Sequence, residues 1–371
     1  MNDINILVIG GGIGGLTAAI ALRGKGHRVT VIEKDPEWSV YGVGIIQQSN
    51  VIRAMAELDL LDDYLAAGVP FDTVAIHAPD GTKVAEVPAP RLVEGYPANV
   101  GIGRPALHKV LGDRTKSAGA EIRLGVTVSE IVQHDDGVDV TFSDGRDESF
   151  DVVIGADGVY SDTRQRILPD AEKPEYTGQA VWRYNFPRPA DLNSLHAYNG
   201  QTGVGLVPIS DELMYMYVTT PEPGKPNYPI DGIAASMRGK LAGTAPQIQA
   251  MADQITDDEG VVYRPMEQMM LYGDWHNGRV VLLGDAVHAT TPHLGQGAGM
   301  AIEDSLVLAE ELTNHDTPAA AFKAYRDRRF ERCRYIVEKS LAICYGQIGK
   351  GPLVDNGKAT AEMFGIVSQP I

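Results

Sequence analysis

The opening of the chain places two short apolar runs on either side of a helical stretch. Residues 4–9 are mostly apolar and lead into a glycine-rich turn, residues 14–25 follow as a helical stretch, and residues 29–33 form a second apolar run. Short, continuous apolar runs are typical of parallel strands that are covered on both faces. The pattern therefore predicts a βαβ unit at the start of the chain.

The middle of the chain predicts further helices and hairpins. Residues 49–67 carry apolar side chains at helical spacing, and residues 105–118 predict a second helix. Residues 71–87 predict a hairpin that turns at the Pro-Asp-Gly of residues 79–81. Residues 121–142 predict strands that are interrupted by an Asp-Asp-Gly turn.

From about residue 176 to residue 265, the pattern changes to aromatic and apolar positions that alternate along each strand. Strands are predicted at 181–186, 203–207 and 213–218, with prolines near their ends, and one helix is expected near 230–241. Alternation of this kind is typical of antiparallel sheets. We therefore expect an antiparallel sheet that is inserted into the first domain.

The continuous apolar pattern is also present at residues 152–155, and it returns at residues 279–284 before two long helices that we expect at about 297–313 and 318–347. The chain thus predicts an α/β fold with a Rossmann-like nucleotide-binding domain of residues 1–175 and 266–371, which includes C-terminal helices. The inserted sheet of residues 176–265 forms a substrate domain, and we expect part of residues 70–100 to pack with it.

The glycines of the first turn have the spacing G-x-G-x-x-G, at Gly10, Gly12 and Gly15. In this motif, the first glycine permits the tight turn, the second lets backbone approach a pyrophosphate, and the third lets the helix pack on the strand. Glu33 ends the second strand, where a carboxylate accepts hydrogen bonds from a ribose hydroxyl. Because an acid there disfavours a 2′-phosphate, the site suits FAD or NAD better than NADP.

Two more acids follow buried apolar strands. Asp157 comes directly after residues 152–155 in an Asp-Gly pair, and Asp285 comes directly after Gly284. Parallel sheets present ligand-facing side chains at their carboxyl edge, so Asp285 is placed to meet a ribityl or pyrophosphate region. Gly295 and Gly297 open a helix whose free N–H groups suit negative charge on a reduced flavin ring.

The charge balance narrows the range of partners. The 371 residues carry a formal net charge of -17 at pH 7. Because such acidity repels phosphate backbones and anionic bilayers, we expect neither nucleic acid nor a membrane surface as a partner. The N-terminal apolar run is too short to span a bilayer and lacks a basic leader, so we expect a cytoplasmic protein. We assign no residue to a metal site.

With these three motifs in order, the chain resembles the class A flavoprotein monooxygenases, the single-component aromatic hydroxylases related to p-hydroxybenzoate, salicylate and 6-hydroxynicotinate hydroxylases. The resemblance implies FAD as the cofactor and NADH or NADPH as a transient co-substrate. It implies that O₂ reacts with the reduced flavin to form a C4a-hydroperoxide. This hydroperoxide hydroxylates a phenolic or hydroxylated N-heteroaromatic substrate, with or without decarboxylation or side-chain loss. Only one G-x-G-x-x-G occurs, so no second Rossmann domain is expected for NAD(P)H.

The resemblance also implies FAD contacts at matching positions. Glu33 would hold the adenosine ribose, Arg104 would contact the pyrophosphate region, and Asp285 would bind the ribityl chain. Asp157 would serve both FAD and NAD(P)H, with Arg164 supporting its loop. The full set of FAD contacts that we expect is Gly10, Gly12, Ile13, Gly14, Gly15, Glu33, Arg104, Val128, Asp157, Asp285, Pro292, Gly295, Gly297 and Ala298.

In this family, the substrate lies between the flavin and the inserted sheet, so we expect the aromatic strands to provide substrate contacts. Side chains alternate along the strand 213–218, and either Tyr215 and Tyr217 or Met214 and Met216 face the pocket. The favoured substrate is a phenolate, because it is more nucleophilic than the neutral ring. Tyr215 or a water chain would take the proton.

Three further residues are candidates for the substrate. Gln47 lies in a segment that passes along the flavin in relatives; glutamine hydrogen-bonds a substrate oxygen but is no base near neutral pH. For His293, a packing role and a substrate contact both stay open. Arg183 would pair a substrate carboxylate bidentately, unless it is an exposed surface arginine. The substrate set is Gln47, Arg183, Tyr215, Tyr217, Pro292 and His293, and the catalytic candidates are Gln47, Tyr215 and His293.

Two alternatives remain open from the sequence. An FAD-dependent oxidase or dehydrogenase could use the same cradle, and a non-enzymatic flavin-binding protein could share the fold. Substrate-stimulated NAD(P)H consumption separates an enzyme from a binding protein, and labelled O₂ in the product separates a monooxygenase from an oxidase. The sequence leaves open whether the protein is a monomer or a homodimer.

Overall fold

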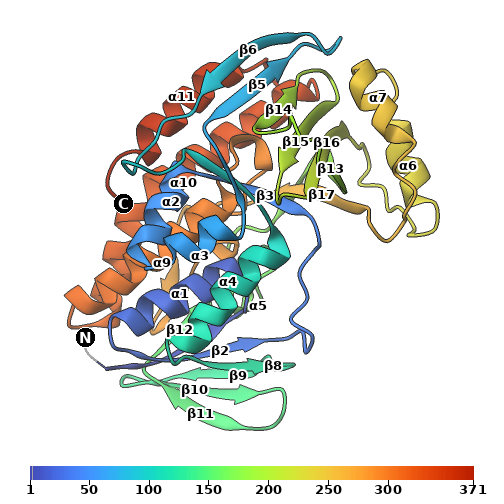
Figure 1. Cartoon of the computed structure of the whole chain (residues 1–371). Coiled ribbons are helices and arrows are strands. Elements are labelled where there is room, and N and C mark those ends of the chain that lie inside the picture. The colour runs from blue at the N-terminus through green and yellow to red at the C-terminus, as the bar shows by residue number, and fades with distance from the viewer. Residues whose placement is uncertain (2) are drawn as a thin grey trace.

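The computed structural model describes residue 1 and residues 3–371, and it contains two large sheets with helices around them (Figure 1). The first is a six-stranded sheet in the order β18-β19-β12-β1-β2-β8. Its strands are β1 (Asn5–Ile9), β2 (Arg28–Glu33), β8 (Glu121–Leu124), β12 (Val152–Gly155), β18 (His276–Asn277) and β19 (Val280–Leu282). All neighbours in it are parallel except the edge pair β18 and β19. The predicted parallel strands are confirmed.

Helices pack on this sheet and on one another. The long helix α9 packs against α1 and against α10, and α1 also packs against α4. The helices of this part are α1 (Ile13–Gly24), α4 (Arg104–Ser117), α5 (Asp162–Ile167), α8 (Asp285–His288), α9 (Gly297–Asn314), α10 (Pro318–Gln347) and α11 (Asn356–Val367). A small antiparallel sheet of β9 (Val128–Gln133), β10 (Val138–Phe142) and β11 (Asp147–Phe150) lies below β2 and β8 in Figure 1.

The second large sheet has seven strands in the order β17-β13-β16-β15-β14-β5-β6. Its strands are β5 (Thr73–His77), β6 (Lys83–Pro88), β13 (Glu175–Pro187), β14 (Leu195–Tyr198), β15 (Gly203–Pro208), β16 (Leu213–Pro221) and β17 (Val262–Gln268). The sheet is mixed and not purely antiparallel, because β14 pairs with β5 in parallel. The hairpin β5–β6 therefore extends the sheet that the later strands begin.

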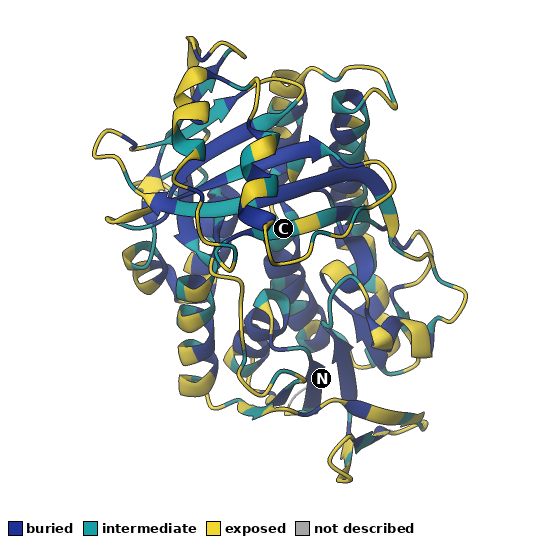
Figure 2. Cartoon of the chain, turned by 90° about the vertical axis from the view of Figure 1, so that its right-hand side faces the viewer, coloured by how far each residue is buried: buried dark blue, intermediate teal, exposed yellow. Residues whose placement is uncertain are grey.

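One face of the seven-stranded sheet packs on its own apolar core. Trp182, Phe186, Met214 and Met216 on this face join a buried cluster with residues of α6 (Ile233–Lys240) and α7 (Pro246–Ala252). Figure 2 shows the strands of the sheets mostly buried, whereas exposed residues gather on helices and loops at the surface. On the opposite face, Val207, Ile209 and Tyr215 form a smaller buried cluster, against which Ile46 of a further small sheet packs.

Between the two large sheets lies a three-stranded antiparallel sheet of β3 (Gly44–Gln48), β7 (Asn99–Gly103) and β4 (Val69–Phe71). The helix that we predicted over residues 49–67 is instead two helices, α2 (Ser49–Glu57) and α3 (Leu61–Ala66). The chain breaks where Asp59 has a φ of 56°, a left-handed conformation that a helix cannot continue through. No helix among the described residues is long and apolar enough to cross a membrane.

Candidate functional site

The glycines of the first turn differ in what surrounds them. Gly10 has a φ of 110°, and a Cβ there would overlap the carbonyl oxygen of Ala156. A Cβ at Gly15 would overlap the carbonyl oxygen of Gly10, whereas a Cβ at Gly12 would meet nothing within 4 Å. Packing thus requires the first and third glycines, and the second faces open space that a ligand can approach.

Glu33 lies beside this turn, at the end of β2. Its carboxylate accepts hydrogen bonds from the backbone N–H groups of Gly11 and Asp35, both at 2.9 Å. The carbonyl oxygen of Gly11 in turn accepts from the indole Nε1 of Trp38 at 2.9 Å and lies 3.0 Å from Nε2 of His108. The turn is therefore held in place by side chains from three separate segments.

A cavity of about 1870 Å³ extends from this turn to the seven-stranded sheet. The predicted site residues that line it are Gly12, Ile13, Gly14, Arg104, Arg183, Tyr215, Tyr217, Asp285, Pro292, His293, Gly295, Gly297 and Ala298. The predicted residues that do not line it are Gly10, Gly15, Glu33, Gln47, Val128 and Asp157. The cavity therefore collects segments from the start, middle and end of the chain.

Asp157 uses its carboxylate within its own loop. It accepts hydrogen bonds from Oγ of Ser161 at 2.5 Å and from the backbone N–H of Thr163 at 2.9 Å. This positions Gly158, which lines the cavity with a φ of 83°. Arg164 is buried and donates to the carbonyl oxygen of Ala286 at 2.9 Å, which ties this loop to the one that carries Asp285.

The carboxyl edge of β19 presents Asp285 to the cavity. The preceding Gly284 has a φ of 64°, and the short helix α8 begins at Asp285. Burial raises the pKa of the Asp285 carboxyl, while His288 and Arg104 act in the opposite direction. Nearby, Gly295 has a φ of 67° and ends a single 3-10 turn, so that α9 begins at Gly297 beside the cavity.

Two arginines in the cavity lack acidic partners. The guanidinium groups of Arg104 and Arg183 form no hydrogen bond or ion pair with the described residues, although Arg104 has Asp285 in its electrostatic environment. Burial lowers the pKa of Arg183 to about 10, and the charge of Arg104 adds to that effect. Both groups stay cationic at neutral pH, so this part of the cavity favours an anion.

Tyr215 and Tyr217 face the cavity, which settles the alternative that the sequence left open. Met214 and Met216 point to the other side of β16, into the core beside α6 and α7. Burial raises the pKa of Tyr215 to about 12, although Arg183 and Arg104 act to lower it. The Tyr215 hydroxyl is therefore protonated at neutral pH.

The glutamine of β3 that lines the cavity is Gln48 and not Gln47. Gln47 is 1% exposed in β3, and neither of its amide atoms has a hydrogen-bond partner among the described residues. Gln48 lines the cavity, and its Oε1 accepts from the amide of Gln296. Adjacent strand residues point to opposite faces, so a shift of one position changes which side chain reaches the site.

His293 is held from both ring nitrogens. Its Nδ1 lies 2.9 Å from Oγ1 of Thr291, and its Nε2 lies 3.0 Å from Oε1 of Gln347. Because the amide oxygen of Gln347 only accepts, we assign the proton to Nε2. Burial lowers the pKa of His293 to about 4, so the ring is neutral at physiological pH.

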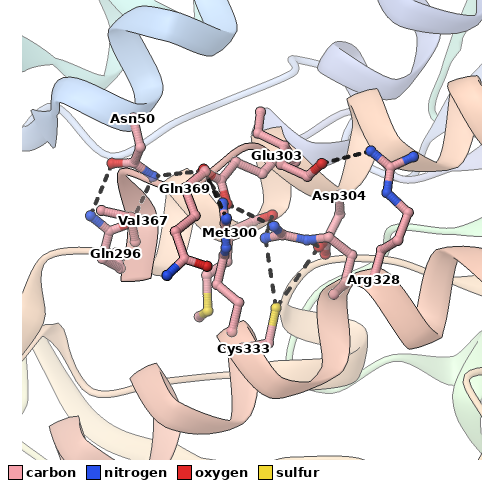
Figure 3. A network of polar contacts seen from close by, with 12 residues as sticks. Asn50, Gln296, Met300, Glu303, Asp304, Arg328, Cys333, Val367 and Gln369 are labelled. Atoms are coloured by element: carbon pink, nitrogen blue, oxygen red, sulfur yellow. Dashed lines mark hydrogen bonds and ion pairs between the residues drawn. The ribbon is translucent and has the colours of Figure 1, made fainter. Parts of the chain in front are cut away.

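A buried network of charges supports the cavity wall from behind (Figure 3). Asp304 on α9 accepts from the backbone N–H of Gly284 at 3.1 Å, from Nε of Arg329 at 2.8 Å and lies 2.6 Å from Nε2 of His288. Burial opposes the charge of Asp304, but His288 and Arg329 lower its pKa to about 2. The network therefore holds the backbone that precedes Asp285.

The same network reaches the turn at Gly295, directly before α9 begins at Gly297. Glu303, next to Asp304 on α9, accepts from Arg329 at 2.8 Å and from the amide of Asn50 at 3.2 Å. Asn50 also donates to Oε1 of Gln296 at 2.9 Å, directly before Gly297. One set of buried contacts thus connects both loops that line the cavity.

Comparison with known proteins gives one family. A family model described as "FAD binding domain" matches residues 3–340. The chain is 33% identical to 6-hydroxynicotinate 3-monooxygenase of Bordetella bronchiseptica over 344 residues, which is 88% of each chain. It is 30% identical to FAD-dependent urate hydroxylase of Klebsiella oxytoca over 360 residues, 93% of this chain and 90% of that protein.

Among solved structures, the fold is similar to that of HpxO of Klebsiella pneumoniae, which was crystallised with FAD and uric acid. The TM-score is 0.85 and the sequence identity is 28%, with 98% of this chain and 92% of that chain covered. The similarity therefore includes the six-stranded sheet, the seven-stranded sheet and the C-terminal helices of this chain.

Proposed function

This chain belongs to the FAD binding domain family, and from that premise we propose that it is a flavoprotein monooxygenase of phenolic or hydroxylated N-heteroaromatic rings. It uses FAD together with NAD(P)H and O₂, and this is supported by relatives that are named as a monooxygenase and as an FAD-dependent hydroxylase. The observation that carries the proposal is the single cavity that joins the glycine turn and Asp285 to Arg183 and Tyr215.

The residues at one end of this cavity fit FAD. Gly12 offers open space beside the N-terminus of α1, where backbone N–H groups favour a pyrophosphate. Glu33 beside the turn would hold the adenosine ribose, Asp285 the ribityl chain, and the start of α9 at Gly297 the flavin ring. When bound, FAD would carry two electrons from NAD(P)H to O₂, so that one oxygen atom of O₂ enters the ring and the other leaves as water.

The other end of the cavity would bind and orient the ring. We propose that residues 176–265 and the hairpin β5–β6 act together as the substrate-binding unit. Arg183 favours the anionic form of the substrate, because its charge stabilises a phenolate or carboxylate, whereas Arg104 is the residue that we expect at the FAD pyrophosphate. A phenolate is the more nucleophilic form, so Arg183 favours the reactive species as well as binding.

Tyr215 would act as a hydrogen-bond donor and not as a preformed base. Its pKa of about 12 keeps the hydroxyl protonated, so it donates to the phenolate oxygen or relays the substrate proton to water. His293 is fixed by Thr291 and Gln347, and we propose that it shapes the wall beside the flavin. We assign the substrate-contacting amide of β3 to Gln48 in place of Gln47, because Gln48 lines the cavity.

The test of this function is a turnover experiment with labelled oxygen. We expect the purified holoenzyme to consume NADH or NADPH faster when a hydroxylated aromatic or N-heteroaromatic is added, and ¹⁸O from ¹⁸O₂ to enter the product. The panel contains hydroxybenzoates, hydroxypyridines and hydroxyquinolines, and the mass of each product is measured by mass spectrometry. Arg183→Met should weaken binding of anionic rings, whereas Tyr215→Phe should slow turnover more than it weakens binding.

Two results would contradict the proposal. Hydrogen peroxide without label in any product identifies an oxidase, and a protein that holds FAD but never consumes NAD(P)H is a flavin carrier. Arg334→Met on α10 is the matched control for Arg183→Met, because it removes a partly exposed guanidinium that does not line the cavity.

A further inference from the structure

The face of the seven-stranded sheet that lines the cavity can be followed through its strand pairing. Arg183 on β13 pairs with Tyr217 on β16, Tyr217 pairs with Gly205 on β15, Gly205 pairs with Ala197 on β14, and Ala197 pairs with Ile76 on β5. Directly paired residues point to the same side of a sheet. These five residues therefore form one row across the cavity face.

A second row continues the same face to the edge of the sheet. Leu195 on β14 pairs with Val74 on β5, and Val74 pairs with Val87 on β6. All three line the cavity. We call Val74, Ile76, Val87, Leu195 and Ala197 the apolar end of the cavity face.

The chemistry of this face changes in one direction. Arg183 on β13 provides a cation, Tyr215 and Tyr217 on β16 provide hydroxyl groups, and the apolar end on β14, β5 and β6 provides hydrocarbon alone. A charged or polar group of a ligand over these five side chains would lose water without gaining a partner from them. The nearest polar residues at the end of β14 that line the cavity are Tyr198 and Asn199, directly after Ala197. The face is therefore suited to a molecule with one polar end and one apolar end.

A second wall of the cavity comes from α11 and the loop before it. Leu353, Ala361 and Phe364 of this segment line the cavity together with Asp355, Asn356 and Thr360, so this wall carries both apolar and polar side chains. Leu353 is 88% exposed and Val87 is 48% exposed, so the protein itself does not cover these side chains. Exposed apolar surface that is continuous with a reaction cavity marks a ligand groove.

We infer that the substrate is a hydroxylated ring that carries an alkyl or prenyl chain, and that this chain lies on the apolar end of the cavity face. The inference rests on the proposed function, since the ring end of the ligand is the one that Arg183 and Tyr215 bind. The cationic end fixes the orientation of the ring, and the chain extends across β14 and β5 toward β6. The apolar end is thus the part of the cavity that selects among hydroxylated rings.

The test compares ligands that differ only in chain length. The Kd values of 2-n-alkyl-4-hydroxyquinolines, from methyl to heptyl, are measured with the holoenzyme by isothermal titration calorimetry. Each added methylene should tighten binding about two- to fourfold, because that is the effect of burying a methylene. Equal Kd values for the methyl and heptyl compounds would overturn the inference.

The β5–β6 hairpin offers a matched pair of variants. Val87 faces the cavity, whereas Val84 on the same strand does not line it and is 60% exposed. Val87→Asp should raise the Kd of the heptyl compound about tenfold or more and leave the Kd of the methyl compound unchanged. The reason is that the heptyl chain would take water from the carboxylate without offering it a hydrogen bond. Val84→Asp should change neither Kd, and an equal effect of the two variants would refute the assignment of the apolar end.

The two proposals fail in different ways. Chain-dependent Kd values without any hydroxylated product would leave the apolar end in place and reject the proposed reaction. Hydroxylation of the methyl and heptyl compounds with equal Kd values would keep the reaction and reject the apolar end.

Discussion

At the scale of single residues, Gly12 and Gly15 belong to one motif but are required for different reasons, ligand space at Gly12 and backbone packing at Gly15. Gly12 has a φ of -81°, which any residue adopts, and its missing side chain leaves only ligand space. We expect Gly12→Leu to fold with an unchanged free energy of unfolding and to lose FAD binding, because the side chain would fill the place of the pyrophosphate. Flavin titration and urea unfolding measure the two effects separately.

Gly15→Ala is the contrasting variant. Alanine normally favours a helix interior over glycine by about 1 kcal/mol, but here its Cβ would overlap the carbonyl oxygen of Gly10. We expect the free energy of unfolding to fall by about 2 kcal/mol or more, because backbone on both sides must move. A stable Gly15→Ala protein, or a Gly12→Leu protein that still binds FAD, would contradict this division of roles.

His293 gives a pH dependence that can be assigned to one ring. Burial lowers its folded pKa to about 4, whereas an unfolded histidine takes up a proton near pH 6.5. Stability from this residue is therefore complete above pH 6.5 and decreases as the pH falls toward 4, by about 3 kcal/mol in total. We expect His293→Asn to show a shallower fall in the free energy of unfolding between pH 7 and pH 4.5.

The control for that measurement is an exposed histidine. His134 lies at the surface in an ion pair with Asp139, so His134→Asn should change the free energy of unfolding much less than His293→Asn does. An unchanged slope for His293→Asn would show that this ring does not carry the effect.

At the scale of elements, the pair α9 and α10 depends on buried charge. Arg329 on α10 is fully buried and donates to both Glu303 and Asp304 on α9. Arg329→Met would leave these acids without their main partner, and we expect a loss of about 3–5 kcal/mol in the free energy of unfolding. Arg334→Met on the exposed face of α10 should cause little change.

FAD affinity supplies a second readout of this network. Asp304 holds the N–H of Gly284, directly before Asp285, so weakening its position should also loosen FAD binding. An Arg329→Met protein as stable as the wild type would show that the apolar packing of α9 and α10 alone maintains their contact.

Sequence periodicity predicted the long elements well and the short ones poorly. The parallel strands and the helices α1, α4, α9 and α10 stand where their apolar spacing placed them. The break near Asp59 and the helix α11 were missed, because a left-handed aspartate leaves no periodic signal and α11 contains glycines at 357 and 365. The break at Asp59 and the helix α11 both depend on tertiary packing, which the spacing of apolar residues does not predict.

At the scale of the whole molecule, the candidate site was predicted best where motifs fix the backbone. The glycine turn, Asp285 and the start of α9 all lie at the cavity, since each follows directly from a strand or opens a helix. The choice between Gln47 and Gln48 depends on a register that one residue of error reverses. The contribution of α11 to the cavity was not predicted, because residues so distant in sequence meet only through the completed fold.

The parallel pairing of β14 with β5 has a consequence for how this architecture can be taken apart. The outer edge of β14 is paired only when residues 73–77 are present. Residues 176–265 expressed alone would therefore have an unpaired edge strand, which favours self-association. Exchange of this insert between related chains would succeed only when the early hairpin travels with it. A chimaera that transplants one piece alone should aggregate, since β14 and β5 would then come from different chains and their side chains would no longer match.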